Sequence, residues 1–326
     1  MIARETIFTF RSPLACWMAK FIQEKRILGW RYETEYKVLC RLDRHLCEIK
    51  LDSEQLPREV VECWAAAAPH EKPESQAVRL RTVRQFTKYL ARHGVPAYSP
   101  PERSRRSPCR NHTPYIFTHG QVAVLLATVD RLEAEGHSPR RHQIMPEVFR
   151  LLYGSGMRVN EVLHLRVADV DLDRGILTVR DAKTRKDRLA PVGNVMAERL
   201  RIYAGTFGHR APDAMFFPAP DGGPYSASAV YTIYRTLLRV CGIPHGGRGR
   251  GPRMHDLRHT FAVHCLERWY RAGADLASKL TYLSAYMGHK SLVGTQRYLR
   301  LTPEIFPDIV VLMEHFSGSA MPKRTP

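Results

Sequence analysis

The sequence lacks the features that mark several common protein classes. Its 7 cysteines include no Cys-x-x-Cys pair, and no carboxylate cluster suggests a two-metal nuclease site. It contains no run of about 18 apolar residues that could span a membrane, and its first residues lack the apolar core and cleavage site of a signal peptide. We therefore expect a cytoplasmic protein with reduced thiols, no metal and no other cofactor.

Acidic residues are too few to balance the basic ones. The chain has 32 Asp and Glu against 50 Lys and Arg, which gives a formal net charge of +18. A surface this positive attracts polyanions, and DNA is the commonest polyanion in a cell, although charge alone does not separate DNA from RNA or an anionic membrane. A length of 326 residues is more than one small core needs and fits two domains.

Residues 1–97 read as a helical domain. Ser12 and Gly29 suit the start and end of a first helix, a second spans about 33–49, a third follows Pro57, and a fourth carries Phe86 on its apolar face. The opposite face of the fourth helix is expected to show Arg79, Arg81, Arg84, Lys88 and Arg92. This stripe is either a solvated surface or a face that contacts phosphates.

Residues 98–114 read as a basic, proline-rich linker, and its candidate DNA-binding residues are Arg103, Arg105 and Arg106. The second domain, 115–326, starts with a capping box from Thr118 to Gln121. The stretches 176–179 and 189–192 read as two strands joined by a polar turn. The expected fold is mainly α with a small antiparallel β-sheet, which makes the second domain an α+β domain.

Five segments of this second domain concentrate polar residues that could carry chemistry. Each has an ordinary structural explanation when taken alone, such as a surface ion pair, a charged turn or a packing tyrosine. His255 and Arg258 are three residues apart, so a helix places them on one face. The candidates are Arg158 with its supporting Glu161, then Lys183 beside Arg185 and Lys186 in the turn, then His255 and Arg258, then His289, and nine residues later Tyr298.

Taken together, the order and spacing of these segments resemble the tyrosine recombinase (phage integrase) family. The segments GSGMRVNEVLHL, ILTVRDAKTRKDRLAPV, HDLRHTFAVH and GHKSLVGTQRYL carry the resemblance, which covers roughly 118–305. It implies that Tyr298 is the nucleophile and that the other catalytic residues are Arg158, Lys183, His255, Arg258 and His289. Lys186 competes with Lys183 for the lysine position, and the long stretch between Arg258 and His289 resembles recombinases of transposons and other mobile elements.

These residue types suit transfer of a DNA strand to the protein. Arg158 and Arg258 can stabilise the charge that builds on the phosphate oxygens, since a guanidinium forks onto two oxygens and stays protonated. His255 can also accept the proton of the tyrosine, and Lys183 can protonate the leaving 5′ oxygen. The covalent 3′-phosphotyrosine keeps the energy of the phosphodiester bond, so rejoining needs neither ATP nor a metal.

The resemblance also implies a site-specific recombinase in which residues 1–97 are a helical core-binding (SAM-like) domain that binds DNA. Its two domains clamp double-stranded DNA, and four protomers exchange strands, alone or beside related recombinases. The apolar tail after Tyr298 docks either on its own domain or on a neighbouring protomer. Three alternatives stay open: a type IB topoisomerase, a catalytically inactive DNA-binding accessory protein, and a metal-dependent nuclease. No membrane partner is expected, and the expected location is the bacterial cytoplasm in association with the nucleoid.

Overall fold

The structure is a computed structural model that describes residues 9–30, 32–66, 69, 71, 73–101, 113–180, 187–247, 251–289, 295 and 298. The chain forms two compact units, residues 1–112 and 113–326. Each unit has its own hydrophobic core. The roles expected for the two domains and for the linker between them stay predictions.

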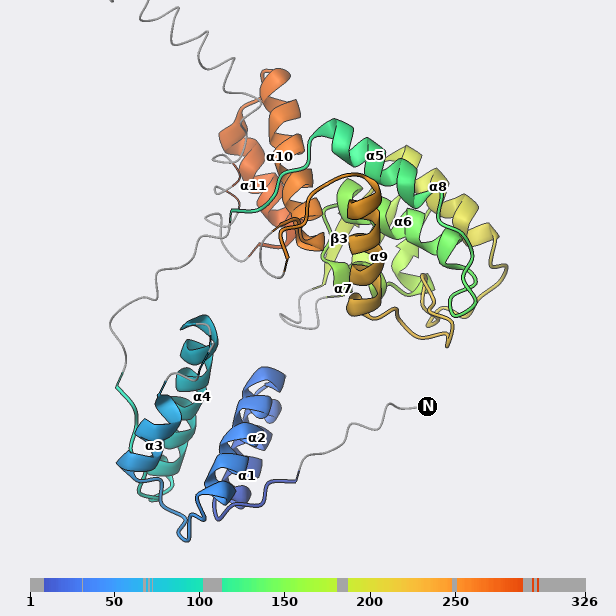
Figure 1. The fold of residues 1–326 in the computed structure, drawn as a ribbon. Helices are drawn as coiled ribbons and strands as arrows, with labels where there is room; N and C mark the ends of the chain where they lie inside the picture. Colours follow the sequence, from blue (N-terminus) through green and yellow to red (C-terminus); the bar gives the residue numbers. More distant parts are fainter. Residues whose placement is uncertain are drawn as a thin grey trace, which may run out of the picture. The chain divides into compact units, whose positions relative to one another are not determined.

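The first unit is helical in its described residues (Figure 1). Its helices are α1 (Ala15–Ile27), α2 (Glu33–Glu48), α3 (Arg58–Ala65) and α4 (Pro73–Arg92). Helix α4 contacts the other three, so its apolar face, with Phe86 fully buried, occupies the centre of the core. Burial of such a face supplies most of the stability of a short helix bundle.

Two expectations for this unit are wrong. Ser12 does not cap α1, because the helix begins at Ala15 and its N-cap position is Leu14, two residues further along the chain. The backbone N–H groups of Arg11 and Ser12 donate instead to the carboxylate of Asp43. Arg79 does not lie on the outward face of α4. Its side chain is buried against the carboxylate of Glu71 and the carbonyl oxygens of residues 64 and 66, so it joins two segments of the unit.

The second unit surrounds a larger core with helices (Figure 1). They are α5 (His119–Val129), α6 (Arg141–Gly154), α7 (Val159–Leu163), α8 (Asn194–Gly205), α9 (Ala227–Val240), α10 (Met254–Arg271) and α11 (Leu276–Met287), with a short 3-10 helix η1 (Val167–Asp169). The capping box at the start of α5 is confirmed, since Thr118 and Gln121 exchange side-chain and backbone hydrogen bonds. Helix α10 contacts both α6 and α11 and links the core to the candidate site.

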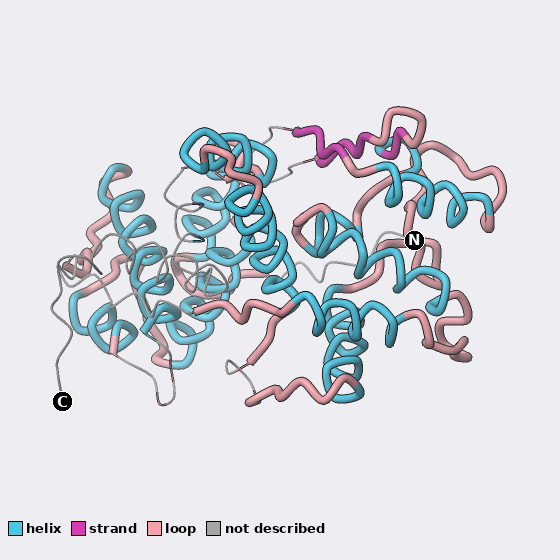
Figure 2. Tube along the Cα trace, turned by 90° about the horizontal axis from the view of Figure 1, so that it is seen from above, coloured by secondary structure: helices cyan, strands magenta, loops and turns pink. Residues whose placement is uncertain are grey.

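A small sheet lies at one edge of this unit (Figure 2). Strands β1 (Val170–Asp171), β2 (Ile176–Val179) and β3 (Arg188–Pro191) pair antiparallel in that order. Val179 pairs with Arg188 at the end of the β2–β3 hairpin, and β3 contacts α11. The register therefore places Arg188 where the hairpin meets the helix that ends beside the site.

The expected fold class, mainly α with a small antiparallel sheet, is confirmed. The described residues contain no helix that is both long and apolar enough to cross a membrane.

Candidate active site

The carboxylate of Glu161 joins two guanidinium groups. Helix α7 starts directly after Arg158, whose backbone N–H and Nη1 donate to Glu161 at 2.8 and 2.6 Å. Arg188 donates to both oxygens of Glu161 at 3.1 and 2.8 Å, and its Nε donates to the carbonyl oxygen of Tyr286. Burial alone would raise the pKa of Glu161, but the hydrogen bonds from the two arginines outweigh it and lower that pKa. The carboxylate is thus ionised and fixes both cations.

The C-terminal end of α11 holds a third guanidinium. Arg258 is only 2% exposed, and it donates to the carbonyl oxygens of Gly156 and Met287. Arg158 donates to the next carbonyl, that of Gly288, at 3.3 Å. The end of a helix carries partial negative charge, which favours cations there. Burial and the nearby Arg158 lower the pKa of Arg258 to about 10, so this side chain is still protonated at pH 7.

Two histidines next to these arginines are neutral at pH 7. Burial, together with the positive charges of Arg258 and Arg158, lowers the pKa of both His255 and His289 to about 4. Of the two, His255 is exposed, so solvent weakens both effects there, and the shift of the half-buried His289 is the firmer one. Nδ1 of His289 is hydrogen-bonded to Oγ1 of Thr295 at 2.7 Å. Three guanidiniums and one carboxylate leave the cluster with a net charge of +2, which favours an anion.

Tyr298 lies against this cluster. It is 2% exposed and packs among apolar side chains of α10 and α11. Its hydroxyl is 3.0 Å from Nδ1 of His259, and its ring centroid is 6.0 Å from that of His289. The negative charge of an ionised Tyr298 would raise the pKa of Arg258, which means that the two groups are near each other. A potential oxygen nucleophile therefore lies beside the cations.

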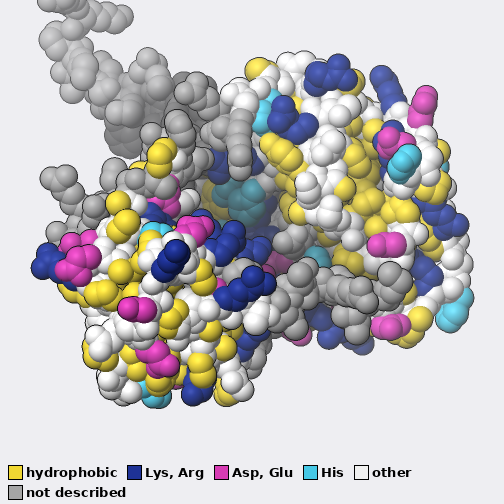
Figure 3. Space-filling view, turned by 60° about the horizontal axis from the view of Figure 1, so that its bottom comes forward, with side chains coloured by type: hydrophobic (Ala, Val, Ile, Leu, Met, Phe, Trp, Pro, Cys, Tyr) yellow, Lys and Arg dark blue, Asp and Glu magenta, His cyan; other side chains and the backbone are white. Residues whose placement is uncertain are grey.

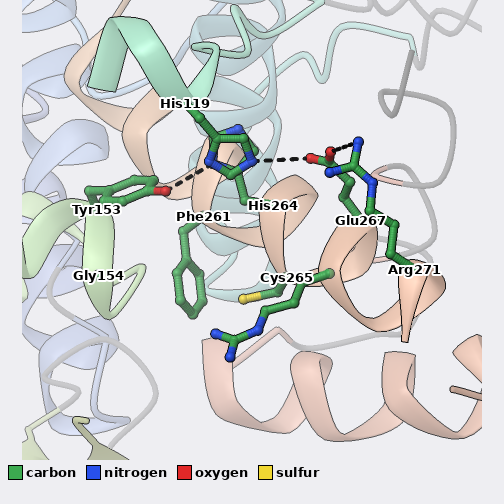
Figure 4. A pocket seen from close by; sticks show the side chains of 9 residues that line it. His119, Tyr153, Gly154, Phe261, His264, Cys265, Glu267 and Arg271 are labelled. Carbon is green, nitrogen blue, oxygen red and sulfur yellow. Dashed lines mark hydrogen bonds and ion pairs between the residues drawn. The ribbon is translucent and has the colours of Figure 1, made fainter. Parts of the chain in front are cut away.

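The second half of α10 is fixed by polar contacts around a cavity of about 440 Å³, which lies outside this cluster (Figure 4). The hydroxyl of Tyr153 on α6 is 2.9 Å from Nδ1 of His264, and the ring of His119 from α5 stacks on His264 at 3.8 Å. Glu267 is paired with Arg271 at 2.7 Å and with His119 at 3.4 Å. These contacts tie α10 to α5 and α6, and so they position the half of α10 that carries the site.

The same contacts place possible metal ligands of His119, His264 and Glu267 within 4.8 Å of one another. The two imidazole rings stack face to face, with only 22° between their planes. That is the arrangement of a packed pair, whereas ligands of one ion direct their nitrogens at a shared point. We assign no metal to this cluster.

The structure brings most of the predicted catalytic residues into one place. The residues gathered are Arg158, Glu161, His255, Arg258, His289 and Tyr298. The predicted Lys183, Arg185 and Lys186 of the hairpin turn lie outside the described residues, as do Arg103, Arg105 and Arg106 of the linker and the chain after Tyr298.

Sequence reasoning misses two contributors to the site. Arg188 reads as part of a charged turn, yet its place at the start of β3 could have singled it out as a residue with a fixed direction. His259 follows Arg258 and lies one helical turn after His255, which is a signal that the motif extends by one residue.

The expected basic stripe of the first unit is partly retained without Arg79. Arg81 and Lys88 are exposed, and Arg84 is half-buried with Nη1 donating to the carbonyl oxygen of residue 101. Arg92 pairs with Glu24 at 2.6 Å. In the view of Figure 3, the Lys and Arg side chains of the described residues lie among apolar and acidic ones.

Comparison with known proteins decides the family. The model of the Phage integrase family matches residues 116–304, which include every residue of the cluster. The chain belongs to the phage integrase family. It is 29% identical over 314 residues to a putative integrase/recombinase, y4rB, of Sinorhizobium fredii, covering 94% of this chain and 97% of that protein. It is also 29% identical over 240 residues to the tyrosine recombinase XerC of Myxococcus xanthus, covering 71% and 73%.

Solved structures of family members share the fold at low sequence identity. The XerH site-specific recombinase, in a post-cleavage complex with a palindromic difH substrate, matches with a TM-score of 0.67 and 14% identity over 94% of this chain and 98% of that chain. The integrase of transposon Tn1549, in complex with transposon right end DNA, matches with a TM-score of 0.61 and 16% identity over 86% and 94%. At these identities the likeness shows the fold alone.

Proposed function

We propose that this protein is a site-specific DNA recombinase that cuts and rejoins DNA through a covalent bond between Tyr298 and a 3′ phosphate. The observation that carries the proposal is the cluster of net charge +2 beside a buried tyrosine hydroxyl. A phosphodiester brings one negative charge, and its transition state spreads more charge over the oxygens. Cations that are already fixed lower the barrier because they need no reorganisation when that charge develops.

Each side chain of the cluster has a role in this scheme. Arg158 and Arg258 contact the non-bridging phosphate oxygens, and Glu161 with Arg188 keeps Arg158 in place. The neutral imidazoles of His255 and His289 donate one hydrogen bond each to the same phosphate. In the scheme taken from the sequence, Lys183 protonates the departing 5′ oxygen, and a 5′-hydroxyl of another strand later attacks the phosphotyrosine. The hairpin residues Arg185 and Lys186 contact the DNA backbone.

The wider assembly is also part of the proposal. Double-stranded DNA with specific recombination sites is the partner, and four protomers exchange strands on two such sites, alone or with related recombinases. The first unit contacts the duplex through Arg81, Arg84 and Lys88, and the linker contacts it through Arg103, Arg105 and Arg106. The proposed biological setting is movement of a mobile element in the cytoplasm, at the nucleoid. It rests on the long stretch between Arg258 and His289, which resembles recombinases of mobile elements.

A covalent-capture experiment tests the proposal and needs no known DNA site. The full chain is incubated with a library of random duplexes that carry a nick. Cleavage near the nick releases a short fragment that carries the free 5′-hydroxyl, and its loss prevents rejoining and so traps the adduct. Protein–DNA adducts that resist denaturation are isolated and sequenced. We expect one enriched sequence family, formation of adducts in EDTA, and loss of adducts in Tyr298→Phe.

The matched control is Tyr282→Phe, because Tyr282 on α11 is 70% exposed and outside the cluster. This variant should form adducts at the wild-type level. Adducts that persist in Tyr298→Phe would remove Tyr298 as the nucleophile. A wild-type protein that binds DNA but forms no adducts would favour the inactive accessory protein, and cleavage that EDTA abolishes would favour the metal-dependent nuclease.

A further inference from the structure

We infer that His259, rather than His255, holds the hydroxyl of Tyr298 and accepts its proton when that oxygen attacks phosphorus. The inference rests on the proposed function and adds a catalytic residue to it. A phenol is a weak nucleophile until it loses its proton, so a base must lie within hydrogen-bond distance of the hydroxyl. His259 meets this condition at 3.0 Å.

The surroundings of Tyr298 make a base in direct contact necessary. The residue is 2% exposed and packs among Ala262, Leu266 and Leu283, in an apolar cluster of α10 and α11. Bulk water has little access to such a hydroxyl, so the proton must move to a protein group. Nδ1 of His259 is hydrogen-bonded to Oη of Tyr298, and the two ring centroids are 5.5 Å apart.

The other two histidines of the site, His255 and His289, are less suited to accept the proton of Tyr298. Nδ1 of His289 is already hydrogen-bonded to Thr295 at 2.7 Å. The ring of His255 meets that of His259 edge to face at 4.7 Å, one helical turn away, whereas the described contact of the Tyr298 hydroxyl is with His259. The positive charges of Arg258 and Arg158 help to lower the pKa of both His255 and His289 to about 4, so both are poor proton acceptors at pH 7.

The proton transfer balances within the strand-transfer step. Nδ1 of His259 accepts only if the ring proton is on Nε2. As the Oη–P bond forms, the phenol proton moves to Nδ1, and the P–O5′ bond breaks with its electron pair on the 5′ oxygen, which takes a proton from a separate acid. The imidazolium forms as negative charge builds on the phosphate, and it keeps the proton for as long as the phosphotyrosine lasts. On rejoining, the 5′-hydroxyl gives its proton back to that separate group as it attacks phosphorus. The P–Oη bond breaks with its electron pair on the tyrosine oxygen, and His259 returns the proton to that oxygen.

Substrates with a bridging sulfur at the 5′ position distinguish this base from an acid. A thiolate leaves without protonation, so the sulfur rescues a variant that lacks the acid and does not rescue one that lacks the base. The test uses the full chain, the nicked duplex captured by the wild-type protein, and single-turnover cleavage at pH 7. The variants are His259→Asn, whose amide keeps a polar group near the position of Nδ1 but cannot take a proton, and His259→Ala.

We expect His259→Asn to bind the duplex like the wild type and to cleave it about 100-fold more slowly, the usual contribution of a general base. The bridging sulfur should not restore the rate, and the rate should increase as the pH approaches about 10, where an ordinary phenol ionises. The matched control is His164→Asn, since His164 is exposed at the end of α7 with its Nδ1 on the carbonyl oxygen of Asn160, and it should cleave normally.

Two results would overturn the inference while leaving the proposed function intact: cleavage by His259→Asn within about threefold of the wild-type rate, or full rescue by the bridging sulfur. If the variants do not fold, ¹⁵N NMR of labelled histidines in the wild-type protein decides the question. The inference requires an unprotonated Nδ1 on His259, and a proton on Nδ1 would contradict it. A wild-type protein that captures no duplex would instead refute the proposed function itself.

Discussion

His255 and His289 owe their neutrality to burial and to the charges beside them. Burial makes a protonated imidazole costly, and the positive charges of Arg258 and Arg158 add to this cost. In an unfolded chain an imidazole binds a proton below about pH 6.5, whereas these two bind one only near pH 4. His289 therefore contributes stability that is complete above pH 6.5 and is lost as the pH falls from there toward 4. Solvent around the exposed His255 reduces its contribution.

NMR titration of labelled histidines should show this directly. We expect the resonance of His289 to titrate near pH 4 in the wild-type protein. In a variant that lacks one of the neighbouring cations, Arg158→Gln, the midpoint should move upward toward the ordinary value. A His289 midpoint near 6.5 in the folded wild-type protein would mean that the cationic cluster does not form as described.

The pairing of Arg188 with Glu161 predicts a large effect of a single substitution. Arg188→Met keeps much of the length of the side chain but leaves the carboxylate of Glu161 with fewer partners, and both side chains of this pair are less than 15% exposed. Removing one partner of a buried ion pair typically costs about 3–5 kcal/mol, so urea should unfold the variant at a clearly lower concentration. The control Arg174→Met breaks a pair that is 79% and 48% exposed and should change the unfolding free energy by less than about 1 kcal/mol. Equal losses in the two variants would contradict the account.

The glycine turn before Arg158 is where one element depends on another. Gly156 has a φ of +57°, and its carbonyl oxygen accepts from Arg258. A Cβ at this position would lie 2.4 Å from the ring of Phe261 on α10. The turn and α10 therefore fit together only if residue 156 has no side chain. This close approach sets the separation of Arg158, which follows the turn, from Arg258 on α10.

Comparison of two glycine variants isolates that close approach. Gly208 has a similar φ of +63°, but a Cβ added there would meet nothing within 4 Å, so Gly208→Ala should cost only the left-handed backbone penalty of about 1–2 kcal/mol. Gly156→Ala adds the collision with Phe261 and should be more destabilising in urea unfolding. Similar losses for the two variants would show that α10 does not pack closely on this turn.

The sequence predicts those structural elements that residues close together in the chain determine. The capping box at Thr118 and the strand at 176–179 are set by neighbours in the chain, and both are confirmed. The expectation for Arg79 is wrong because helical spacing does not tell which basic residue of α4 faces Glu71. The contact of His259 with Tyr298 depends on how α10 meets residues 39 positions later, which no local pattern encodes. The role of the hairpin lysine stays a prediction, since Lys183 lies outside the described residues.

The net charge of +18 acts on the molecule as a whole. Affinity for DNA that comes from phosphate contacts falls with salt, because binding releases condensed counterions. We expect the double variant Arg84→Gln/Lys88→Gln to bind the captured duplex more weakly and to reduce the slope of log K against log salt by about 1.8, or about 0.9 for each phosphate contact. Fluorescence anisotropy over a series of salt concentrations measures this slope. An unchanged slope would mean that Arg84 and Lys88 of α4 face solvent and contact no phosphate. Arg174→Gln serves as the control for loss of an exposed charge.

The proposed strand transfer depends on which atom of the protein attacks the phosphate. Protease digestion and mass spectrometry of the trapped protein–DNA adduct identify the modified residue directly. We expect a single nucleotide-bearing peptide with the 3′ phosphate on the oxygen of Tyr298. A phosphate found on any other residue, such as Tyr286 or Ser284 of α11, would contradict it.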